Sequence, residues 1–416
     1  MRIGFLFNHD QIHQVAHGLP IALALAKQRT GAEIIICSAN ERITREIRIL
    51  AGRSLDRDLK LVELGLASRS SLIFEALAGR LIPASKLLMY RDNLEFFRSL
   101  DVLVVPEKTS LLLKDRFGLR DLKIIHVRHG AGDRAIGFNK ASARFDHVLA
   151  AGPKIRDRLV AEAGVSPDKI SVIGYPKFDL FPLPTRDPLE TGRRPVVLYN
   201  PHVAPHLSSW YKSGRDVLSW FADHREYELI FAPHIMLFER RIAVTIQPPR
   251  LRRPGSIPKR ALDAENILVD VGSRALTTMD YLNRADIYLG DASSQVYEYL
   301  IEPRPCIFLN AHGLDWERDK NFAHWQLGPV LDNVDRLGET LLTAFAGHRS
   351  TDRSVQEAML LYSFDLNGTP SSVRAAQVIK EVAGCSRRAV KNSRRPAPRR
   401  PSIQPVPAFA ATSAIP

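Results

Sequence analysis

The chain has 416 residues, more than one ordinary domain needs and a comfortable length for two. Hydrophobic residues make up 45% of it, and the net charge of +13 indicates an anionic partner. No apolar run approaches the roughly 20 residues that span a bilayer, and the N-terminus lacks the features of a signal peptide. We therefore expect neither a membrane span nor a secreted protein.

Positive charge is concentrated at the C-terminus. Residues 385–416 carry seven Lys or Arg residues, no Asp or Glu, and many Pro, Ala and Ser residues. This composition predicts a disordered basic tail. Such a tail binds acidic membranes or nucleic acid, or it merely solubilises the protein, and both interpretations stay open.

The three cysteines are Cys37, Cys306 and Cys385. No pair has the spacing of metal ligands or of a redox motif. We expect reduced, structural thiols, no metal, and a cytoplasmic protein that is at most peripheral on the inner face of the cell membrane.

In chain order, residues 2–8 and 32–38 are short apolar runs typical of strands, and residues 20–29 between them predict a helix with Pro20 in its first turn. This βαβ start implies a parallel sheet. His13 and His17 precede that helix. Two His four residues apart on a helix can bind a metal, but Gly18 and Pro20 are expected to break the helix there. A loop that faces a cleft and contacts the substrate is the favoured interpretation.

Residues 41–100 look mainly helical, and strands are predicted at 101–105, 122–127 and 147–150. The second of these strands runs into HVRHGAGDR, residues 126–134. Gly130 and Gly132 allow a tight turn and close approach to a ligand. His129 is a candidate general base because its ordinary pKa lies near neutrality, although a histidine that is merely hydrogen-bonded in a loop remains the alternative.

A helix at 154–163 and a strand at 169–173 follow, and the run GYPKFD ends the first half. The second half repeats the alternation. Its predicted strands and helices are as follows: strands at 196–200, 227–232, 267–271, 285–289 and 306–309; helices at 213–223, 277–284, 334–345, 354–362 and 371–383. We predict an α/β protein of two Rossmann-like domains facing across a cleft. The domains are residues 1–180 and 196–384, joined by a linker at 181–195 and followed by the tail at 385–416.

Strands of the second half end in polar or His-bearing turns. Pro233-His234 follows one strand, and Gly290-Asp291 with Ser293-Ser294 follows another. Asp291 or Ser293 is suited to cap the next helix, whose N–H groups can hold a phosphate. Capping without any ligand is the alternative.

These motifs, in this order, resemble the CDP-glycerol glycerophosphotransferases of teichoic-acid synthesis, which have a two-domain GT-B-like fold. The resemblance spans roughly residues 123–310. It rests on His-Gly after a strand, FDHVLAAG, GYPKFD, Pro-His after a strand, GDASSQVYEYL and RPCIFLN. GYPKFD matches a Gly-x-Pro-x-x-Asp run at Gly174, Pro176 and Asp179.

The resemblance implies roles for single residues. His129 would be the general base, and His234 would face the donor phosphates as a second catalytic histidine. Gly130 and Arg134 would contact the donor. The serine motif, which includes Asp291, Ser293 and Ser294, would bind phosphates, and Glu298 would contact ribose. Because a carboxylate facing phosphate would repel it, Asp291 is expected to cap or to orient hydroxyl groups.

The chain departs from the family at several positions. Residues 131–134 read Ala-Gly-Asp-Arg where the family has Thr-Pro-Leu-Lys. Ala292 replaces an aromatic residue, Ile235 replaces a second proline, and YNPHVAPH replaces a Pro-Thr-Trp-Arg run. These changes leave the acceptor and the donor open.

We therefore predict a transferase without cofactor or metal. It would move glycerol phosphate or a related group from a CDP-activated donor to a hydroxyl of a glycan or lipid-linked acceptor of the cell envelope. A nucleotide-sugar glycosyltransferase or a UDP-GlcNAc 2-epimerase-like enzyme is the first alternative. A non-catalytic protein that binds anionic surfaces is the second. No specific nucleic acid is expected, because no basic stripe with aromatics occurs outside the tail.

Overall fold

The computed structural model describes residues 1–9, 11–29, 31–66, 82–128, 130–181, 193–239, 241–246, 249–348 and 352–384. Three predicted features therefore lie wholly or largely outside the described residues: the tail at 385–416, the linker at 181–195 and the candidate base His129. Predictions that concern them stay predictions.

The first half forms a seven-stranded sheet in the order β3-β2-β1-β4-β5-β6-β7, and every neighbouring pair is parallel. Most of its strands are buried on both faces, which is why they are continuous apolar runs in the sequence. The strands are β1 (Arg2–Phe7), β2 (Glu33–Ser38), β3 (Lys60–Glu63), β4 (Val102–Val105), β5 (Lys123–Val127), β6 (His147–Ala150) and β7 (Ile170–Val172). The helices are α1 (Val15–Lys27), α2 (Glu41–Ala51), α3 (Ser54–Asp58), α5 (Ile82–Asp92), α6 (Leu94–Arg98), α7 (Leu112–Asp115) and α8 (Pro153–Ala163). The 3-10 turns are η1 (Ile12–Gln14), η2 (Lys108–Leu111), η3 (Ala135–Phe138), η4 (Lys140–Arg144), η5 (Pro167–Lys169) and η6 (Pro176–Asp179).

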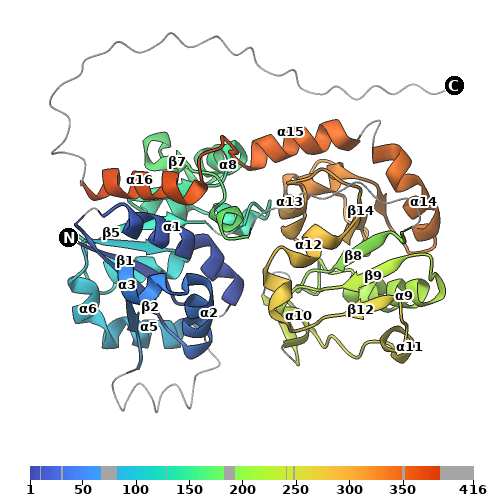
Figure 1. Cartoon of the computed structure of the whole chain (residues 1–416), viewed down its shortest axis with the longest axis horizontal. Helices are drawn as coiled ribbons and strands as arrows, with labels where there is room; N and C mark the ends of the chain where they lie inside the picture. Colours follow the sequence, from blue (N-terminus) through green and yellow to red (C-terminus); the bar gives the residue numbers. More distant parts are fainter. Residues whose placement is uncertain are drawn as a thin grey trace, which may run out of the picture.

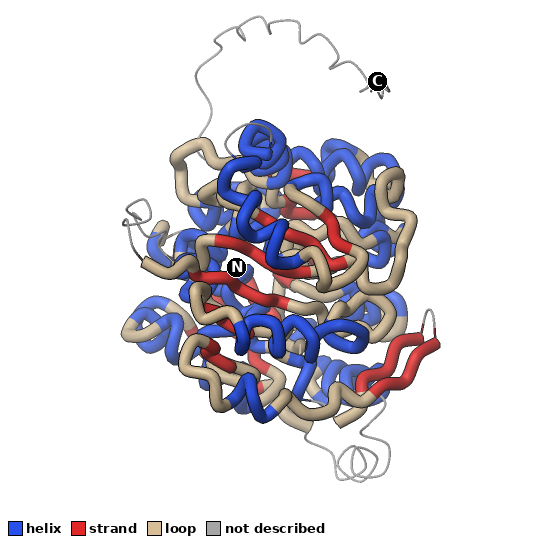
Figure 2. Tube along the Cα trace, turned by 90° about the vertical axis from the view of Figure 1, so that its right-hand side faces the viewer, coloured by secondary structure: helices blue, strands red, loops and turns tan. Residues whose placement is uncertain are grey.

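The second half forms a six-stranded parallel sheet in the order β12-β9-β8-β13-β14-β15. Its strands are β8 (Val196–Asn200), β9 (Glu228–Phe231), β12 (Ile267–Val269), β13 (Ile287–Gly290), β14 (Cys306–Leu309) and β15 (Val330–Leu331). An antiparallel hairpin, β10 (Ala243–Ile246) with β11 (Pro249–Arg252), stands out from the body (Figure 2). The helices and turns are α9 (Trp210–Asp223), α10 (Met236–Glu239), α11 (Lys259–Leu262), η7 (Arg274–Thr277), α12 (Asp280–Arg284), α13 (Gln295–Tyr299), η8 (Lys320–Leu327), α14 (Leu337–Gly347), α15 (Arg353–Ser363) and α16 (Ser371–Ala383).

The two sheets lie side by side as separate lobes, which confirms the predicted α/β class with two parallel sheets (Figure 1). The chain then returns to its first half, because α16 lies against α1 at the first sheet. Ala375, Ala376 and Ile379 of α16 are fully buried in the first core. The domain limits at residues 180 and 196 stay a prediction, but the final helix, which that prediction assigned to the second domain, packs on the first.

One local prediction is wrong. Helix α1 begins at Val15 and contains both Gly18 and Pro20, which were expected to lie outside it or at its start. Burial of Val15 and Leu19 extends the helix, and a Cβ at Gly18 would lie only 3.1 Å from the Phe7 ring, so glycine permits this packing. The described part of residues 41–100 is mainly helical, as expected, but strand β3 within it was not predicted, since a half-exposed edge strand lacks a strong apolar signal.

Among the described residues, no helix is both long and apolar enough to cross a membrane.

Candidate active site

A cavity of about 610 Å³ opens between the two sheets. Its walls come largely from loops at the carboxyl ends of strands in both sheets, where open α/β sheets bind ligands. Most of the residues predicted to form the site line it: His13, His17, Gly130, Arg134, His234, Ser293, Ser294 and Glu298. The described residues contain no group of three His, Cys, Asp or Glu side chains placed to share a metal ion.

The glycine-rich loop after β5 and the serine turn after β13 are in contact. Gly130 has a φ of +74°, which favours glycine. A Cβ at Gly132 would lie 2.9 Å from the Ser294 Cβ, so only glycine lets the loop approach this closely. Two motifs that are 160 residues apart in the chain thus form one wall of the cavity. Arg128 and Gly130, the chain neighbours of His129, both line the cavity as well.

Basic and histidine side chains also line the cavity. His202 follows β8, His234 follows β9, and their rings lie 5.9 Å apart. Arg134 Nη1 lies 3.1 Å from His202 Nε2. Burial, with help from the Arg134 charge, lowers the pKa of His234 to about 4 and holds the pKa of His202 well below its usual range. Both rings are therefore neutral at pH 7.

Both ring nitrogens of His202 face hydrogen-bond donors. Its Nδ1 accepts a hydrogen bond from the backbone N–H of Ala204 at 2.9 Å, which places the single ring proton on Nε2. That N–H then faces the guanidinium of Arg134, which has only donors. Because both groups are donors, an anion bound beside them would supply oxygens that accept from both.

Asp291, for which a cap or a hydroxyl-orienting role was expected, does not line the cavity. It is fully buried and accepts hydrogen bonds from the backbone N–H groups of His202, Ser209 and Ala292 at 2.6 to 2.8 Å. The Ser209 hydroxyl also donates to it at 2.8 Å. These hydrogen bonds satisfy the buried carboxyl group within the protein. Asp291 therefore positions the loop that bears His202.

The predicted capping of the helix after the serine turn is also largely wrong. Helix α13 has five residues, Ser294 is its N-cap, and no side chain caps it. Ser293 Oγ accepts from the Gln295 N–H only at 3.4 Å. A helix this short has little dipole, so any phosphate contact here depends on the two hydroxyl groups.

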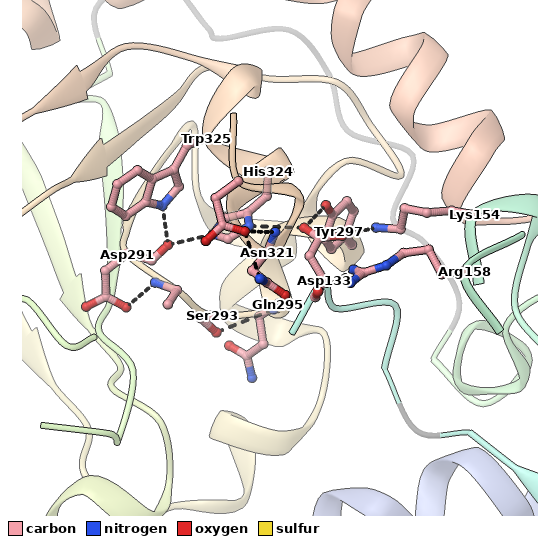
Figure 3. A network of polar contacts seen from close by, with 12 residues as sticks. Asp133, Lys154, Arg158, Asp291, Ser293, Gln295, Tyr297, Asn321, His324 and Trp325 are labelled. Carbon is pink, nitrogen blue, oxygen red and sulfur yellow. Dashed lines mark hydrogen bonds and ion pairs between the residues drawn. The ribbon is translucent and has the colours of Figure 1, made fainter. Parts of the chain in front are cut away.

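Beside the serine turn lies a buried ionic network that joins the two halves (Figure 3). The Asp133 carboxylate contacts Lys154 Nζ at 2.8 Å, His324 Nδ1 at 3.1 Å and the Tyr297 hydroxyl. Lys154 lies on α8 of the first half, while Tyr297 and His324 belong to the second. His324 Nε2 also lies 2.9 Å from the Asp291 carbonyl. Both His324 nitrogens thus face acceptors.

Electrostatics favour the charged form of Asp133. Burial acts to raise the pKa of Asp133, but the hydrogen bond from His324 and the charge of Lys154 overcome it and hold the pKa at about 2. Burial also lowers the pKa of Lys154 to about 8, by more than the Asp133 charge raises it. The network therefore keeps the carboxylate ionised at a desolvation cost to the ammonium group.

A second buried contact between the halves involves Glu298. Its two carboxylate oxygens accept hydrogen bonds from the Tyr175 hydroxyl at 2.7 Å and from Lys177 Nζ at 2.6 Å. The ribose contact predicted for Glu298 stays untested, but both oxygens are engaged in this structure.

Tyr175 and Lys177 belong to GYPKFD, which proves to be a structural junction. Asp179 accepts hydrogen bonds from the N–H groups of Ser371 and Ser372, the first turn of α16, at 3.3 and 2.6 Å. A Cβ at Gly174 would lie 2.3 Å from Ser371 Oγ, so glycine is required beside that turn. The motif thus ties α16 and α13 to the end of the first sheet.

Sequence reasoning missed several residues of the cavity. His202 could have been found, because it follows a predicted strand in the same way as His234. Lys154, which lies behind the cavity wall, and His324 belong to no motif, and Tyr297 lies within GDASSQVYEYL without being singled out. All three meet Asp133 only in the folded chain.

No protein family model and no curated protein sequence matches the chain. Solved structures with a similar fold include a protein from Listeria monocytogenes described as a UDP-N-acetylglucosamine 2-epimerase. Its TM-score is 0.58 at 13% identity, over 91% of this chain and 94% of that one. The UDP-GlcNAc 2-epimerase of Neisseria meningitidis, bound to UDP-GlcNAc, has a TM-score of 0.54 at 13% identity, over 92% and 99%.

The wall teichoic acid polymerase TagF, in crystals soaked with CDPG, has a TM-score of 0.57 at 14% identity, over 92% of this chain and 89% of that one. These likenesses extend over nearly the whole chain, but identities this low establish the fold and nothing finer. The chain therefore has the GT-B-like fold, which the epimerases and the polymerase share.

Proposed function

We propose that the chain is a transferase that moves glycerol phosphate, or a related polyol phosphate, from a CDP-activated donor to a hydroxyl group of a glycan or lipid-linked acceptor. One observation carries the proposal above the others. Arg134 and neutral His202 direct N–H donors at each other beside Ser293, Ser294 and His234 in one cavity. That arrangement suits the diphosphate of an activated donor.

His234 supports the same assignment. Its Nδ1 accepts a hydrogen bond from the Met236 N–H at 3.3 Å, which places the proton on Nε2 and makes that atom a donor. A neutral histidine, a guanidinium group and two hydroxyl groups would hold the diphosphate without an obligatory metal. The two charges of the donor would then be balanced chiefly by Arg134.

The reaction follows from this placement. The acceptor oxygen attacks the phosphorus atom that bears the polyol, and a new P–O bond forms. The bond from that phosphorus to the bridging oxygen of the diphosphate breaks, and CMP leaves with the bridging oxygen. His129 takes the proton from the acceptor hydroxyl, a step worth roughly 10²- to 10⁴-fold in rate. Positioning and charge stabilisation supply most of the rest, as in other phosphoryl transfers.

The carboxylates of the cavity favour phosphate chemistry over epimerisation, the runner-up. Moving a proton on a sugar carbon calls for a base held near that carbon. The carboxylates that line the cavity are each bonded to a lysine: Glu107 to Lys86, Asp133 to Lys154, and Glu298 to Lys177. Phosphate transfer needs no free carboxylate, since it depends on positive charge and alignment.

The nucleotide released tests the proposal. Purified protein is incubated with CDP-glycerol, CDP-ribitol or UDP-sugars and a polyol-phosphate or glycolipid acceptor, and the products are separated. We expect CMP from a CDP-polyol donor. Release of UDP from a UDP-sugar would instead support glycosyl transfer, and conversion of a UDP-sugar into its epimer would support epimerisation. A failure of every nucleotide to bind in calorimetry would support the non-catalytic alternative.

The role of His129 is tested separately. His129→Ala is expected to lower kcat about 10²- to 10⁴-fold with little change in donor affinity, because a general base acts in the transition state. Steady-state kinetics and donor calorimetry on the same preparation separate the two effects. Wild-type turnover in this variant would end the catalytic assignment.

A further inference from the structure

Two cations lie together on the first-sheet side of the cavity. Lys108 begins η2 after β4, and Arg128 directly follows β5. Both line the cavity. Lys108 Nζ donates to the Gly137 carbonyl at 3.0 Å, and Arg128 Nη1 donates to the same oxygen. Their charges are therefore only a few ångströms apart.

Neither cation has a carboxylate partner among the described residues. The neighbouring acid, Glu107, forms an ion pair with Lys86 and accepts a hydrogen bond from the Thr109 hydroxyl at 3.1 Å. In the described part of the chain, Lys108 and Arg128 bond only to neutral oxygens, those of Gly137 and Asn139. Arg128 Nε is buried and has no hydrogen-bond partner in that part of the chain.

A further arginine stands nearby, but its charge is compensated. Arg158 and Arg128 lie over the ring of Phe138, with guanidinium carbons 4.0 and 4.4 Å from its centre. Arg158 is paired with Glu162 at 2.8 Å. The excess positive charge at this end of the cavity therefore belongs to Lys108 and Arg128.

Holding these two cations costs free energy that an anion would offset. Burial, and secondarily the Arg128 charge, lowers the pKa of Lys108 to about 8. Burial, and secondarily the Arg158 charge, lowers the pKa of Arg128 to about 10. The backbone is shaped for this arrangement, because a Cβ at Gly137 would lie 2.6 Å from Arg128 Nη2. An oxyanion beside both cations would accept from Arg128 Nε and would further favour the charged forms of both side chains.

We propose that Lys108 and Arg128 form a second oxyanion site, separate from the donor site, which binds a phosphate group of the acceptor. This inference rests on the proposed function, because it assigns the two ends of one cavity to the two substrates. The donor contacts come mainly from loops of the second sheet, whereas Lys108 and Arg128 follow adjacent strands of the first sheet. An acceptor with a phosphate near its reacting hydroxyl would be anchored here and point that hydroxyl at the donor.

Calorimetry with a small probe tests the site directly. Glycerol 3-phosphate, inorganic phosphate and glycerol are titrated into the full chain, with and without saturating CDP. We expect glycerol 3-phosphate to bind whether or not CDP is present, and glycerol to bind about tenfold more weakly or worse, because it lacks the charge. Displacement of the probe by CDP would place it in the donor site and overturn the proposal. Tighter binding of inorganic phosphate than of glycerol 3-phosphate would overturn the acceptor assignment.

Variants identify the residues. Lys108→Gln and Arg128→Gln are each expected to weaken glycerol 3-phosphate about tenfold, since a charge-assisted hydrogen bond is lost. Lys108→Arg, which keeps the charge, should retain most of the affinity and shows that loss in the glutamine variant is not misfolding. Lys140→Gln is the matched control, because this exposed lysine lies in the adjacent turn η4 outside the cavity. Wild-type affinity in both glutamine variants would overturn the proposal.

Transfer kinetics separate this inference from the proposed function. Lys108→Gln is expected to raise KM for a phosphorylated acceptor about tenfold, with kcat, donor KM and KM for a neutral acceptor little changed. If nucleotide is released but KM of Lys108→Gln for every phosphorylated acceptor stays at the wild-type value, the proposed acceptor site is wrong and the proposed transferase activity is supported. If no donor yields nucleotide while both glutamine variants lose affinity for phosphate, the proposed transferase activity is wrong and the oxyanion site is supported.

Discussion

His324 and His202 lie on the same side of the cavity in opposite electrostatic settings. Both ring nitrogens of His324 face acceptors, the Asp133 carboxylate and the Asp291 carbonyl. Both ring nitrogens of His202 face donors, the Ala204 N–H and the Arg134 guanidinium. The first region is complete without a ligand, and the second lacks an acceptor. We infer that the first holds the two halves together and that the second receives the anionic substrate.

Removing the carboxylate from the complete region is expected to have the largest effect. Asp133→Asn leaves Lys154 buried without its counter-charge, and breaking one partner of a buried pair costs about 3–5 kcal/mol in the free energy of unfolding. Chemical denaturation measures it. Asp263→Asn, which breaks the exposed pair with Lys259, is the control and should change stability little. Equal effects would mean that the Asp133 network does not hold the halves together.

The same region predicts a loss of stability in acid. Because the pKa of Asp133 is held at about 2, below its ordinary 3.8, the unfolded chain binds the proton first as the pH falls. The contribution of Asp133 to the free energy of unfolding is fully present above pH 3.8 and is lost as the pH falls from 3.8 toward about 2. It amounts to about 2 kcal/mol. The difference between the wild type and Asp133→Asn in urea unfolding should narrow over that range, and a constant difference would contradict the shift.

Arg134→Gln examines the incomplete region. Arg134 contacts His202 without a carboxylate partner among the described residues, so its removal relieves a mismatch and should not lower stability. Donor affinity is expected to fall about tenfold, because a charge-assisted hydrogen bond to phosphate is lost. Thermal unfolding and donor calorimetry give the two values. A large loss of stability with unchanged affinity would make Arg134 a structural residue like Lys154.

The smallest expected effect concerns the contact between the motifs. Gly132→Ala places a Cβ 2.9 Å from the Ser294 Cβ and pushes the loop from the serine turn. We expect a loss of a few-fold in kcat/KM, equivalent to about 1 kcal/mol. Gly65→Ala is the control, since a Cβ there meets nothing within 4 Å. Equal activity of the two variants would show that the close approach is not needed.

The sequence could predict much of the fold because burial repeats locally. Short apolar runs alternating with amphipathic segments identified β1, β2, β4 to β9 and β12 to β14 within a few residues. Three features were not predicted, because they carry little apolar pattern: the half-exposed β3, the hairpin β10–β11 and the two-residue β15. Pro20 was taken for a helix start, but packing of the residues before it extends α1.

For the candidate site, the sequence by itself placed His234, Ser293, Ser294, Gly130 and Arg134 at strand ends, and a parallel sheet gathers its strand ends at one edge. Only the tertiary structure decided which side chains meet across the two sheets. Asp133 contacts His324, 191 residues away in the sequence, and Glu298 contacts Lys177, 121 residues away. Helix α16 packs in the core of the first half. Helix and strand periods report local burial. They hold no information on the relative orientation of two sheets, and that orientation determines which charges are paired and which are left for a ligand.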